Sequence, residues 1–573
     1  MRKISSLLLI ILTLLLVVTS CSEKDDPIVE KGDLIRAIFN PSTKSFTLKY
    51  SKGSIETIDA EIDNSVTPPT AKATLEDGTI ISVNDATKEG EATIGSLSGY
   101  QYVNNWIYKE MNIYYLWNDL IPKKPDFTQN PNKFFDSLLN TYDKNSNPEG
   151  DRFSWIDDNY RNLLGSLSGI KSDEIGFEYI FAYGDASKTK LYAIITYPKL
   201  GSDAYNKGID RGRFITQVDG KDITNNNYRS VFSGTGSKTL SMADWVYSSY
   251  EDKYKLTPAN NVTIRMEKNF AEAPIYLDSV YTIGDKKIGY MVYNFFATDK
   301  GDDSHDYDRL LMNKLANIKS KGATEMVLDL RYNGGGAVST AIALASALVK
   351  ERSTNNVLVT AEYNNLVHAA LLREENNADY NKDYFIDKIK YGRKEIAVPA
   401  LNLPRLYVLV TGGSASASEF IINGLKPYMD VILIGETTYG KNVGSISIYE
   451  KDDPKNEWGL QPIIVKFSNS DGESDFTDGF VPDFQVNELK VNLSDKTITR
   501  PLVEFGNTED PLLSKAIEQI TGKLSTRSSM NRQISTQYQM NEIEGTNSNF
   551  KNKVRFEMYD DVRGKQIKEL MKK

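Results

Sequence analysis

Ser416 and Lys441 are the two residues of this sequence best placed to carry out covalent chemistry together. Ser416 lies in a run of glycine, serine and alanine, and Lys441 ends a glycine-flanked segment 25 residues later. A hydroxyl nucleophile needs a base, which is most often histidine. The chain has 2 histidines, and neither His305 nor His368 lies in a triad-like pattern. A lysine can replace histidine where burial removes its proton near neutral pH.

Two predicted strands and the helix between them would bring this pair together. The apolar runs at 406–410 and 431–435 predict buried strands, and residues 416–426 between them predict a helix. Such a crossover unit is almost always right-handed, with parallel strands. Ser416, at the start of the helix, and Lys441, just past the second strand, would therefore reach the same sheet edge, where α/β folds place their sites.

A third predicted strand, 325–330, ends at that edge and runs into a turn with three consecutive glycines, Gly334–Gly336. Glycine lets the backbone approach a ligand closely. Amides of this turn, with the amide of Ala417, would bind the negative oxygen of a tetrahedral intermediate. Glu419 lies one helical turn after Ser416, so its carboxylate would hold the serine or the lysine in place.

Each feature also has a purely structural interpretation. Gly334–Gly336 would serve as a plain turn, Lys441 as a solvated surface lysine, and Glu419 as a carboxylate stabilised by a helix N-terminus. A phosphate site is disfavoured because the glycine turn lacks the Lys-Ser/Thr pair of a P-loop and the spacing of a dinucleotide fingerprint. The convergence of the features at one sheet edge favours the catalytic interpretation.

Three motifs resemble those of the C-terminal-processing, or tail-specific, serine peptidases, which use a Ser-Lys dyad. They are the serine run at Ser414–Glu419, the glycine-to-lysine segment at Gly435–Lys441 and the turn at Asp329–Gly336. Gly334 replaces a proline often found in that turn. Weaker matches occur at Lys287–Tyr290 and Gly479–Asp483, and the resemblance covers roughly residues 160 to 490.

The resemblance implies that Ser416 is the nucleophile, Lys441 the base and Glu419 the third member of the site. It implies Gly335 and Ala417 as oxyanion donors, with Gly336 as the alternative to Gly335. It also implies a crotonase- or ClpP-like α/β core that needs no metal or organic cofactor.

Residues 166–270 resemble a PDZ domain. The loop around Ile175, Gly176 and Phe177 resembles its carboxylate-binding loop, whose amides would hold the terminal carboxylate of a peptide that adds as a strand to a sheet edge. Arg213 stands where an acidic residue is usual. A PDZ-like fold kept only for packing or gating is therefore the alternative.

The N-terminus reads as a bacterial lipoprotein signal. A basic start, an apolar run at 7–18 and small residues precede Cys21, the only cysteine of the chain, so no disulfide can form within it. Cys21 is the expected lipidation site and would anchor the protein to a membrane. The acidic stretch 22–26 resembles a surface-export signal. We expect an outer-membrane lipoprotein of the bacterial cell envelope, on its periplasmic or its surface face.

The length of 573 residues predicts several domains in a multidomain α+β fold. The expected segments are a signal peptide at 1–20, a lipidated tether at 21–32, a small β domain at 33–95, a helical domain at 96–165, the PDZ-like domain at 166–270, the Ser-Lys peptidase core at 275–495 and a polar C-terminal region at 496–573. Within the last of these, residues 556–571 predict a short amphipathic helix.

The sequence thus predicts an envelope serine endopeptidase acting on extended or C-terminal segments of protein and peptide substrates. A net charge of −9 without a basic run argues against nucleic acid as a partner. The alternative is a non-catalytic lipoprotein that binds peptides or proteins on a peptidase-like scaffold.

Overall fold

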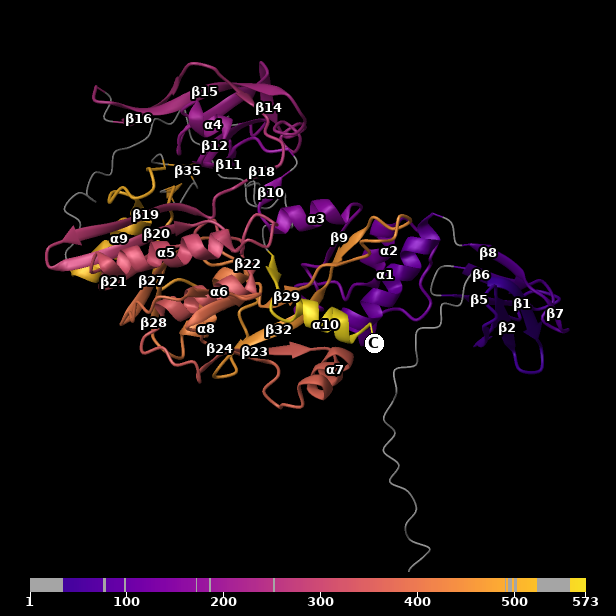
Figure 1. Cartoon of the computed structure of the whole chain (residues 1–573). Coiled ribbons are helices and arrows are strands. Elements are labelled where there is room, and N and C mark those ends of the chain that lie inside the picture. The colour runs from indigo at the N-terminus through magenta and orange to yellow at the C-terminus, as the bar shows by residue number, and fades with distance from the viewer. Residues whose placement is uncertain are drawn as a thin grey trace, which may run out of the picture. The chain divides into compact units, whose positions relative to one another are not determined.

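The computed structural model describes residues 34–75, 79–96, 99–171, 173–184, 187–250, 253–489, 491–492, 497–498, 502–522 and 557–572 (Figure 1). The signal segment and Cys21 lie outside these ranges. The chain divides into two compact units, residues 1–102 and 103–573. No helix within the described ranges is both long and apolar enough to cross a membrane.

The first unit contains two small antiparallel sheets, with strand orders β3-β2-β1-β7 and β4-β5-β6-β8. Alternate residues of β2 point inward, so that Phe46 and Leu48 join Phe39 in a buried core. The strands are β1 (Leu34–Asn40), β2 (Ser45–Tyr50), β3 (Ile55–Asp59), β4 (Glu61–Asp63), β5 (Thr70–Thr74), β6 (Thr79–Val83), β7 (Gly90–Glu91) and β8 (Thr93–Ser96).

Helical segments follow, and one short strand among them pairs with the core. Helix α1 (Tyr100–Tyr114) buries Val103, Ile107 and Met111, which recur every four residues along one face. The other elements are η1 (Asn118–Leu120), α2 (Pro131–Leu138), β9 (Trp155–Asp157) and α3 (Tyr160–Leu167). Strand β9 pairs with β31 (Gly459–Gln461), which pairs with β30 (Ile448–Tyr449), so Trp155 is fixed beside the core.

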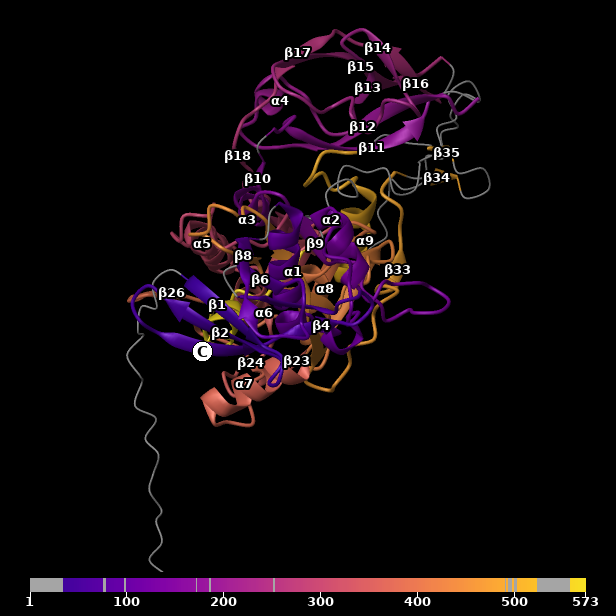
Figure 2. The same ribbon diagram turned by 90° about the vertical axis from the view of Figure 1, so that its right-hand side faces the viewer.

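Residues 170–271 form a mostly β region, whose strands appear as one group in Figure 2. Its 7-stranded sheet has the order β11-β12-β14-β13-β15-β16, with β17 paired to β15. Arg211 of this region donates hydrogen bonds to the hydroxyl of Tyr332 and to Glu488, which ties it to the core. The elements are β10 (Ile170–Lys171), β11 (Phe177–Tyr183), β12 (Lys190–Pro198), α4 (Asp203–Asn206), β13 (Phe214–Val218), β14 (Lys221–Thr224), β15 (Ser237–Ser248), β16 (Lys253–Pro258), β17 (Val262–Arg265) and β18 (Phe270–Ala271).

A 6-stranded sheet of order β19-β20-β21-β27-β28-β33 forms the first half of the core. Its strands are parallel from β20 onward, and β19 is an antiparallel edge strand. The bounds are β19 (Ile275–Ile283), β20 (Lys286–Tyr293), β21 (Glu325–Asp329), β27 (Arg405–Val410), β28 (Asp430–Gly435) and β33 (Phe484–Gln485), with helices α5 (Asp306–Ser320), α6 (Val338–Leu348), α8 (Ala417–Leu425) and α9 (Pro511–Thr521). Leu512 and Ala516 of α9 pack on Val327, Leu409 and Ile434 of the sheet.

A second 6-stranded sheet has the order β22-β36-β29-β32-β23-β24. Its strands are β22 (Gly336–Ala337), β36 (Met558–Tyr559), β29 (Val443–Ser445), β32 (Ile463–Asn469), β23 (Val357–Tyr363) and β24 (Lys382–Tyr384). The remaining elements are α7 (Asn365–Glu375), β25 (Lys388–Tyr391), β26 (Lys394–Ala397), β34 (Val491–Asn492), β35 (Thr497–Ile498) and α10 (Gly564–Leu570).

The C-terminal part of the chain departs from the sequence prediction. The core was expected to stop at residue 495, but α9 packs on the first sheet and β36 lies inside the second. The helix expected over 556–571 begins only at Gly564, because Met558 and Tyr559 pair with strands on both sides instead. A strand of two residues carries no periodic pattern that a sequence could reveal.

Candidate active site

Ser416 occupies the N-terminal end of α8 in a backbone conformation that L-residues avoid. Its φ is 64° and its ψ is −114°. Such strain persists only where surrounding contacts impose it. Here Ser414 Oγ donates to Leu330 O at 2.7 Å, and the amide of Ala415 donates to Asn333 O at 3.1 Å. Ser416 is fully buried, and its side chain forms a capping box with Glu419 at the first turn of α8.

The strand–helix–strand unit has the predicted parallel arrangement and places Ser416 and Lys441 past the ends of neighbouring strands. Val410, the last residue of β27, pairs in parallel register with Gly435, the last residue of β28. Ser416 follows the first strand and Lys441 follows the second. Both residues therefore lie at one edge of the sheet.

Glu419 ties the two catalytic candidates together through their backbones. Its Oε2 accepts the amides of Ser416 at 2.9 Å and Lys441 at 2.8 Å, and its Oε1 accepts the amide of Gly440 at 2.7 Å and Thr438 Oγ1 at 2.6 Å. Burial raises the pKa of the Glu419 carboxyl, and these four donors act in the opposite direction. Glu419 thus fixes backbone positions on both sides of the site.

Lys441 is fully buried, and its ammonium contacts the C-terminal part of the chain. Nζ lies 3.0 Å from Oε2 of Glu557 and 4.7 Å from the ring centroid of Phe153. Burial lowers the pKa of Lys441, while the charge of Glu557 partly opposes that shift. A lysine in this setting loses its proton more readily than one in water.

Glu557 is a residue of the site that sequence reasoning missed. Its carboxylate accepts hydrogen bonds from Trp155 Nε1 at 2.8 Å and Ser445 Oγ at 2.8 Å, in addition to Lys441. Burial raises the pKa of this carboxyl. Glu557 follows Lys441 by 116 residues and belongs to no motif, so the sequence carries no signal for the contact.

The glycine turn lies against Ser416, but one of its amides is already engaged. The amide of Gly335 donates to Asn333 Oδ1 at 2.9 Å, and the backbone φ of Gly335 is 113°. A side chain on Gly335 would collide with Ser416 and with the carbonyl oxygen of Glu557. The amide of Ala417 is the first of α8 and therefore has no acceptor within the helix.

The loop around Gly176, which was predicted to bind a carboxylate, already holds a carboxylate of its own chain. The amide of Gly176 donates to Oε1 of Glu174 at 2.9 Å. Nζ of Lys199 lies 2.5 Å from Glu174, 2.9 Å from Glu178 and 3.0 Å from Glu272, and all four side chains are buried. Ile175 and Phe177, the neighbours of Gly176, are buried as well.

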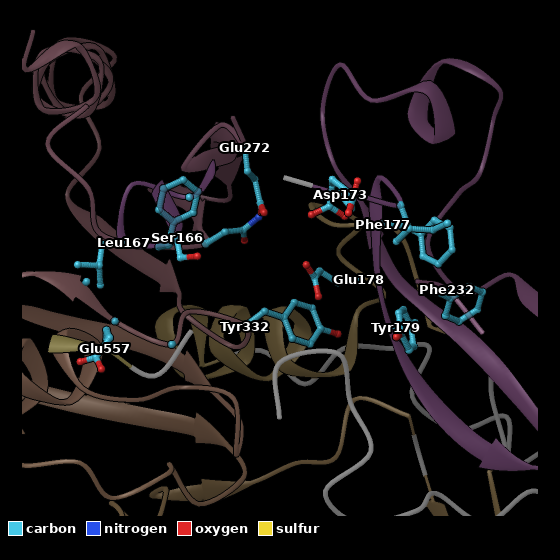
Figure 3. A pocket seen from close by; sticks show the side chains of 18 of the residues that line it. Ser166, Leu167, Asp173, Phe177, Glu178, Tyr179, Phe232, Glu272, Tyr332 and Glu557 are labelled. Atoms are coloured by element: carbon cyan, nitrogen blue, oxygen red, sulfur yellow. The ribbon is translucent and has the colours of Figure 1, made fainter. Parts of the chain in front are cut away.

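A cavity of about 410 Å³ connects this loop with the glycine turn. Its walls include Phe177 and Phe232 at one end and Gly335 with Glu557 at the other. Figure 3 shows Glu178 and Glu272 lying between these two ends. The described residues contain no group of three His, Cys, Asp or Glu side chains that could hold a metal ion.

Two protein-family models match the chain. The model of peptidase family S41 matches residues 287–486, and the model of the peptidase S41 N-terminal domain matches residues 102–155. Residues 287–486 belong to peptidase family S41. The first match contains Ser416, Glu419, Lys441 and the glycine turn, and the second ends at Trp155. Glu557 lies outside both matches.

Two named proteins and one solved structure are among those similar to this chain. A Staphylococcus aureus protein named "Probable CtpA-like serine protease" is 24% identical over 325 residues, which cover 56% of this chain and 54% of that protein. A "Carboxyl-terminal-processing protease" from Picosynechococcus is 24% identical over 58% of this chain and 71% of that protein. The match thus spans about half the length of the staphylococcal relative.

The solved structure is that of a Bacteroides fragilis protein with the provisional name of S41 protease. It is 26% identical, has a TM-score of 0.57, and covers 73% of this chain and 97% of its own. The S41 fold therefore extends over most of the described chain.

Proposed function

We propose that this S41 chain is a serine endopeptidase that cleaves extended or C-terminal segments of proteins through an acyl-enzyme on Ser416. The observation that carries the proposal is the bonding of Glu419 to the amides of both Ser416 and Lys441. This single carboxylate sets a strained serine and a buried lysine at one sheet edge. Nucleophile and base in one fixed frame are what acyl transfer requires.

Each step of the proposed reaction uses residues of this frame. Ser416 Oγ attacks the scissile carbonyl carbon, and neutral Lys441 accepts the hydroxyl proton and passes it to the leaving amine. Water then hydrolyses the ester with Lys441 again as the base. The amide of Ala417 stabilises the oxyanion. The amide of Gly335 joins it once its bond to Asn333 is released, since catalytic hydrogen bonds often form only with substrate bound.

The PDZ-like loop contributes to substrate binding in this proposal. The cavity that borders the glycine turn is also lined by Ile175 and Phe177, the two neighbours of Gly176. An extended peptide in this cavity would therefore reach both the loop around Gly176 and the glycine turn. Binding of a terminal carboxylate requires Glu174 to release the amide of Gly176.

The protein acts at the bacterial cell envelope in this proposal, held by a lipid on Cys21. The lipoprotein-like signal around Cys21 motivates this assignment. Metabolic labelling with a clickable fatty acid should mark the wild-type protein and leave a Cys21→Ser variant unmarked. Equal labelling of the two proteins, or none in either, would exclude the anchor.

Cleavage of an unstructured protein by the mature form with Cys21→Ser tests the catalytic proposal. Ser416→Ala and Lys441→Ala should each lower the rate at least about a thousandfold, because nucleophile and base act as a unit. The wild-type rate should rise with pH as Lys441 loses its proton.

Matched substitutions in the same helix provide the controls. Ser418→Ala removes a hydroxyl that bonds Asn333 O, and Lys426→Ala removes an exposed lysine that directly follows α8. Both should retain most of the activity. Full activity in Ser416→Ala would refute the peptidase proposal. A folded wild type whose Ser416 never reacts would favour the non-catalytic binding protein instead.

A further inference from the structure

The buried state of the catalytic candidates raises the question of how a substrate reaches them. Ser416 and Lys441 both have 0% exposed surface. A nucleophile that attacks another molecule has to be reachable, so some part of the present structure has to move aside. The cavity beside the site identifies that part, because Glu557 and Tyr559 line it together with Gly335.

The C-terminal strand β36 occupies a slot between two strands of the site. On one side it pairs in parallel with β22, which follows the glycine turn, through Gly336 with Met558 and Ala337 with Tyr559. On the other side Tyr559 pairs with Ser445 of β29, which follows Lys441. Without β36 these two strands would present facing unpaired edges, and such edges bind an extended peptide.

Glu557, which directly precedes β36, also contacts the groups that would act on a scissile bond. The space beside Gly335 that a side chain would fill is bounded by Ser416 Oγ and by the backbone carbonyl oxygen of Glu557. The carboxylate of the same residue pairs with Lys441 Nζ at 3.0 Å. Glu557 thus places its backbone carbonyl oxygen near Ser416 and its carboxylate beside Lys441.

Contacts that follow β36 hold it in the slot. Asp560 accepts a hydrogen bond from the hydroxyl of Tyr363 at 2.8 Å, and Asp561 accepts the amide of Ser339 at 2.9 Å. Arg563 forms two bonds to Asp383, at 2.9 and 2.8 Å, in a buried ion pair. These anchors lie after residue 559, so the part at the site, residues 557–559, can leave the slot while the anchors stay in place.

We propose that the slot between β22 and β29 binds the extended segment of a peptide substrate, and that residues 557–559 of the same chain fill this slot and close the site. The inference rests on the proposed peptidase function. Substrate competes with the chain's own strand for the same edges, so the reactive fraction of the protein is the fraction in which the strand has left.

A reversible cross-link tests the closure directly. In the mature full chain with Cys21→Ser, Ala337→Cys and Tyr559→Cys place two thiols on register partners of β22 and β36. A fluorophosphonate probe reports on the reactivity of Ser416. The Oγ of Ser416 bonds to the phosphorus of the probe, fluoride leaves, and Lys441 takes the hydroxyl proton. Mass spectrometry measures the rate of this modification in the oxidised and the reduced protein.

We expect oxidation to slow the labelling of Ser416 at least about tenfold and reduction to restore it. A control pair, Thr47→Cys with Thr57→Cys, joins exposed register partners of β2 and β3 in the first unit, and its oxidation should leave labelling unchanged. Equal labelling of the locked and the reduced protein would overturn the closure and leave the peptidase proposal standing. No labelling in any form, the reduced protein included, would overturn the peptidase proposal itself.

A second variant covers the case in which the cysteine pair does not fold. Glu557→Gln keeps the shape of the side chain but removes its charge beside Lys441. Because loss of this charge also lowers the pKa of Lys441, the two proteins are compared at a pH above which neither labelling rate rises further. If the strand closes the site, labelling of Ser416 should be severalfold faster in this variant under that condition, with the thermal midpoint checked to confirm folding. Slower labelling in a folded Glu557→Gln protein would instead make Glu557 a positioning residue of the lysine and would overturn the closure.

Discussion

Glu419 and Glu557 are two buried carboxylates on either side of Lys441, and they hold it in different ways. Glu419 accepts three backbone amides and one hydroxyl, so it belongs to the frame that shapes the site. The carboxylate of Glu557 contacts the side chains of Lys441, Ser445 and Trp155. Side chains can rotate away while backbone amides cannot, so the first carboxylate is fixed and the second is exchangeable.

Substitution of the fixed carboxylate should have the largest effect. Glu419→Gln turns one acceptor into a donor that faces N–H groups, which leaves buried donors unsatisfied. We expect a loss of about 2–4 kcal/mol of unfolding free energy, measured by denaturant unfolding. Glu473→Gln, at an exposed glutamate of the same core, should change stability by no more than about 0.5 kcal/mol. Equal stability of Glu419→Gln and wild type would show that the Glu419 carboxylate does not hold the backbone of the site in place.

Asp561 belongs to the same C-terminal segment as Glu557, and its titration should make the stability of the protein depend on pH. Burial raises the pKa of its carboxyl from 3.8 to about 6. The folded protein therefore binds this proton more tightly than the unfolded chain, so the contribution of Asp561 is present below pH 4 and is lost as the pH rises to about 6. Asp561→Asn removes the titration. The stability advantage of wild type over this variant should fall by about 2–3 kcal/mol across that range.

Thermal midpoints of both proteins at intervals from pH 4 to pH 7 measure this difference. The pH dependence of Asp561→Asn should be flatter than that of wild type between pH 4 and pH 6. Parallel curves would show that the pKa of Asp561 is not raised in the folded protein.

The charge of Glu557 should be visible in the pH dependence of Ser416 labelling. Its carboxylate raises the pKa of Lys441 against the lowering caused by burial. In Glu557→Gln that opposition is lost, so the pKa of Lys441 falls. The rise of labelling rate with pH should therefore occur at lower pH than in wild type. An unmoved profile would mean that Lys441 does not act as the base.

Trp155 should show the smallest effect, since it contributes one hydrogen bond to Glu557. Trp155→Phe removes that bond, whereas Trp245→Phe removes a buried indole N–H that has no partner among the described residues. The first variant should lose about 1 kcal/mol more stability than the second in urea unfolding. Equal losses of stability in the two variants would mean that the hydrogen bond from Trp155 to Glu557 does not stabilise the protein.

The part of the site built around Glu419 could be predicted from the sequence, and the contribution of Glu557 could not. Ser416, Glu419 and Lys441 lie next to long apolar strands and glycine turns, so local patterns place them at one sheet edge. The contact of Glu557 with Lys441 joins distant parts of the chain through a strand of two residues. Local patterns contain no information about such a pairing.

The PDZ-like loop shows a second limit of the sequence. The pattern around Gly176 predicts a turn with amides available to a ligand. It does not predict that Glu174 folds back onto the amide of Gly176, because that depends on Lys199 drawing three glutamates together. Side-chain pairing in a buried cluster is a tertiary property.

The insertion of β36 between β22 and β29 has a consequence for biosynthesis. The ribosome makes β22, the helix of Ser416 and the loop of Lys441 before it makes Glu557. A nascent chain would hold the slot open until its C-terminal strand emerges. The order of translation therefore places the closing strand last, so each molecule would pass through an uncovered state once before its own chain covers the serine.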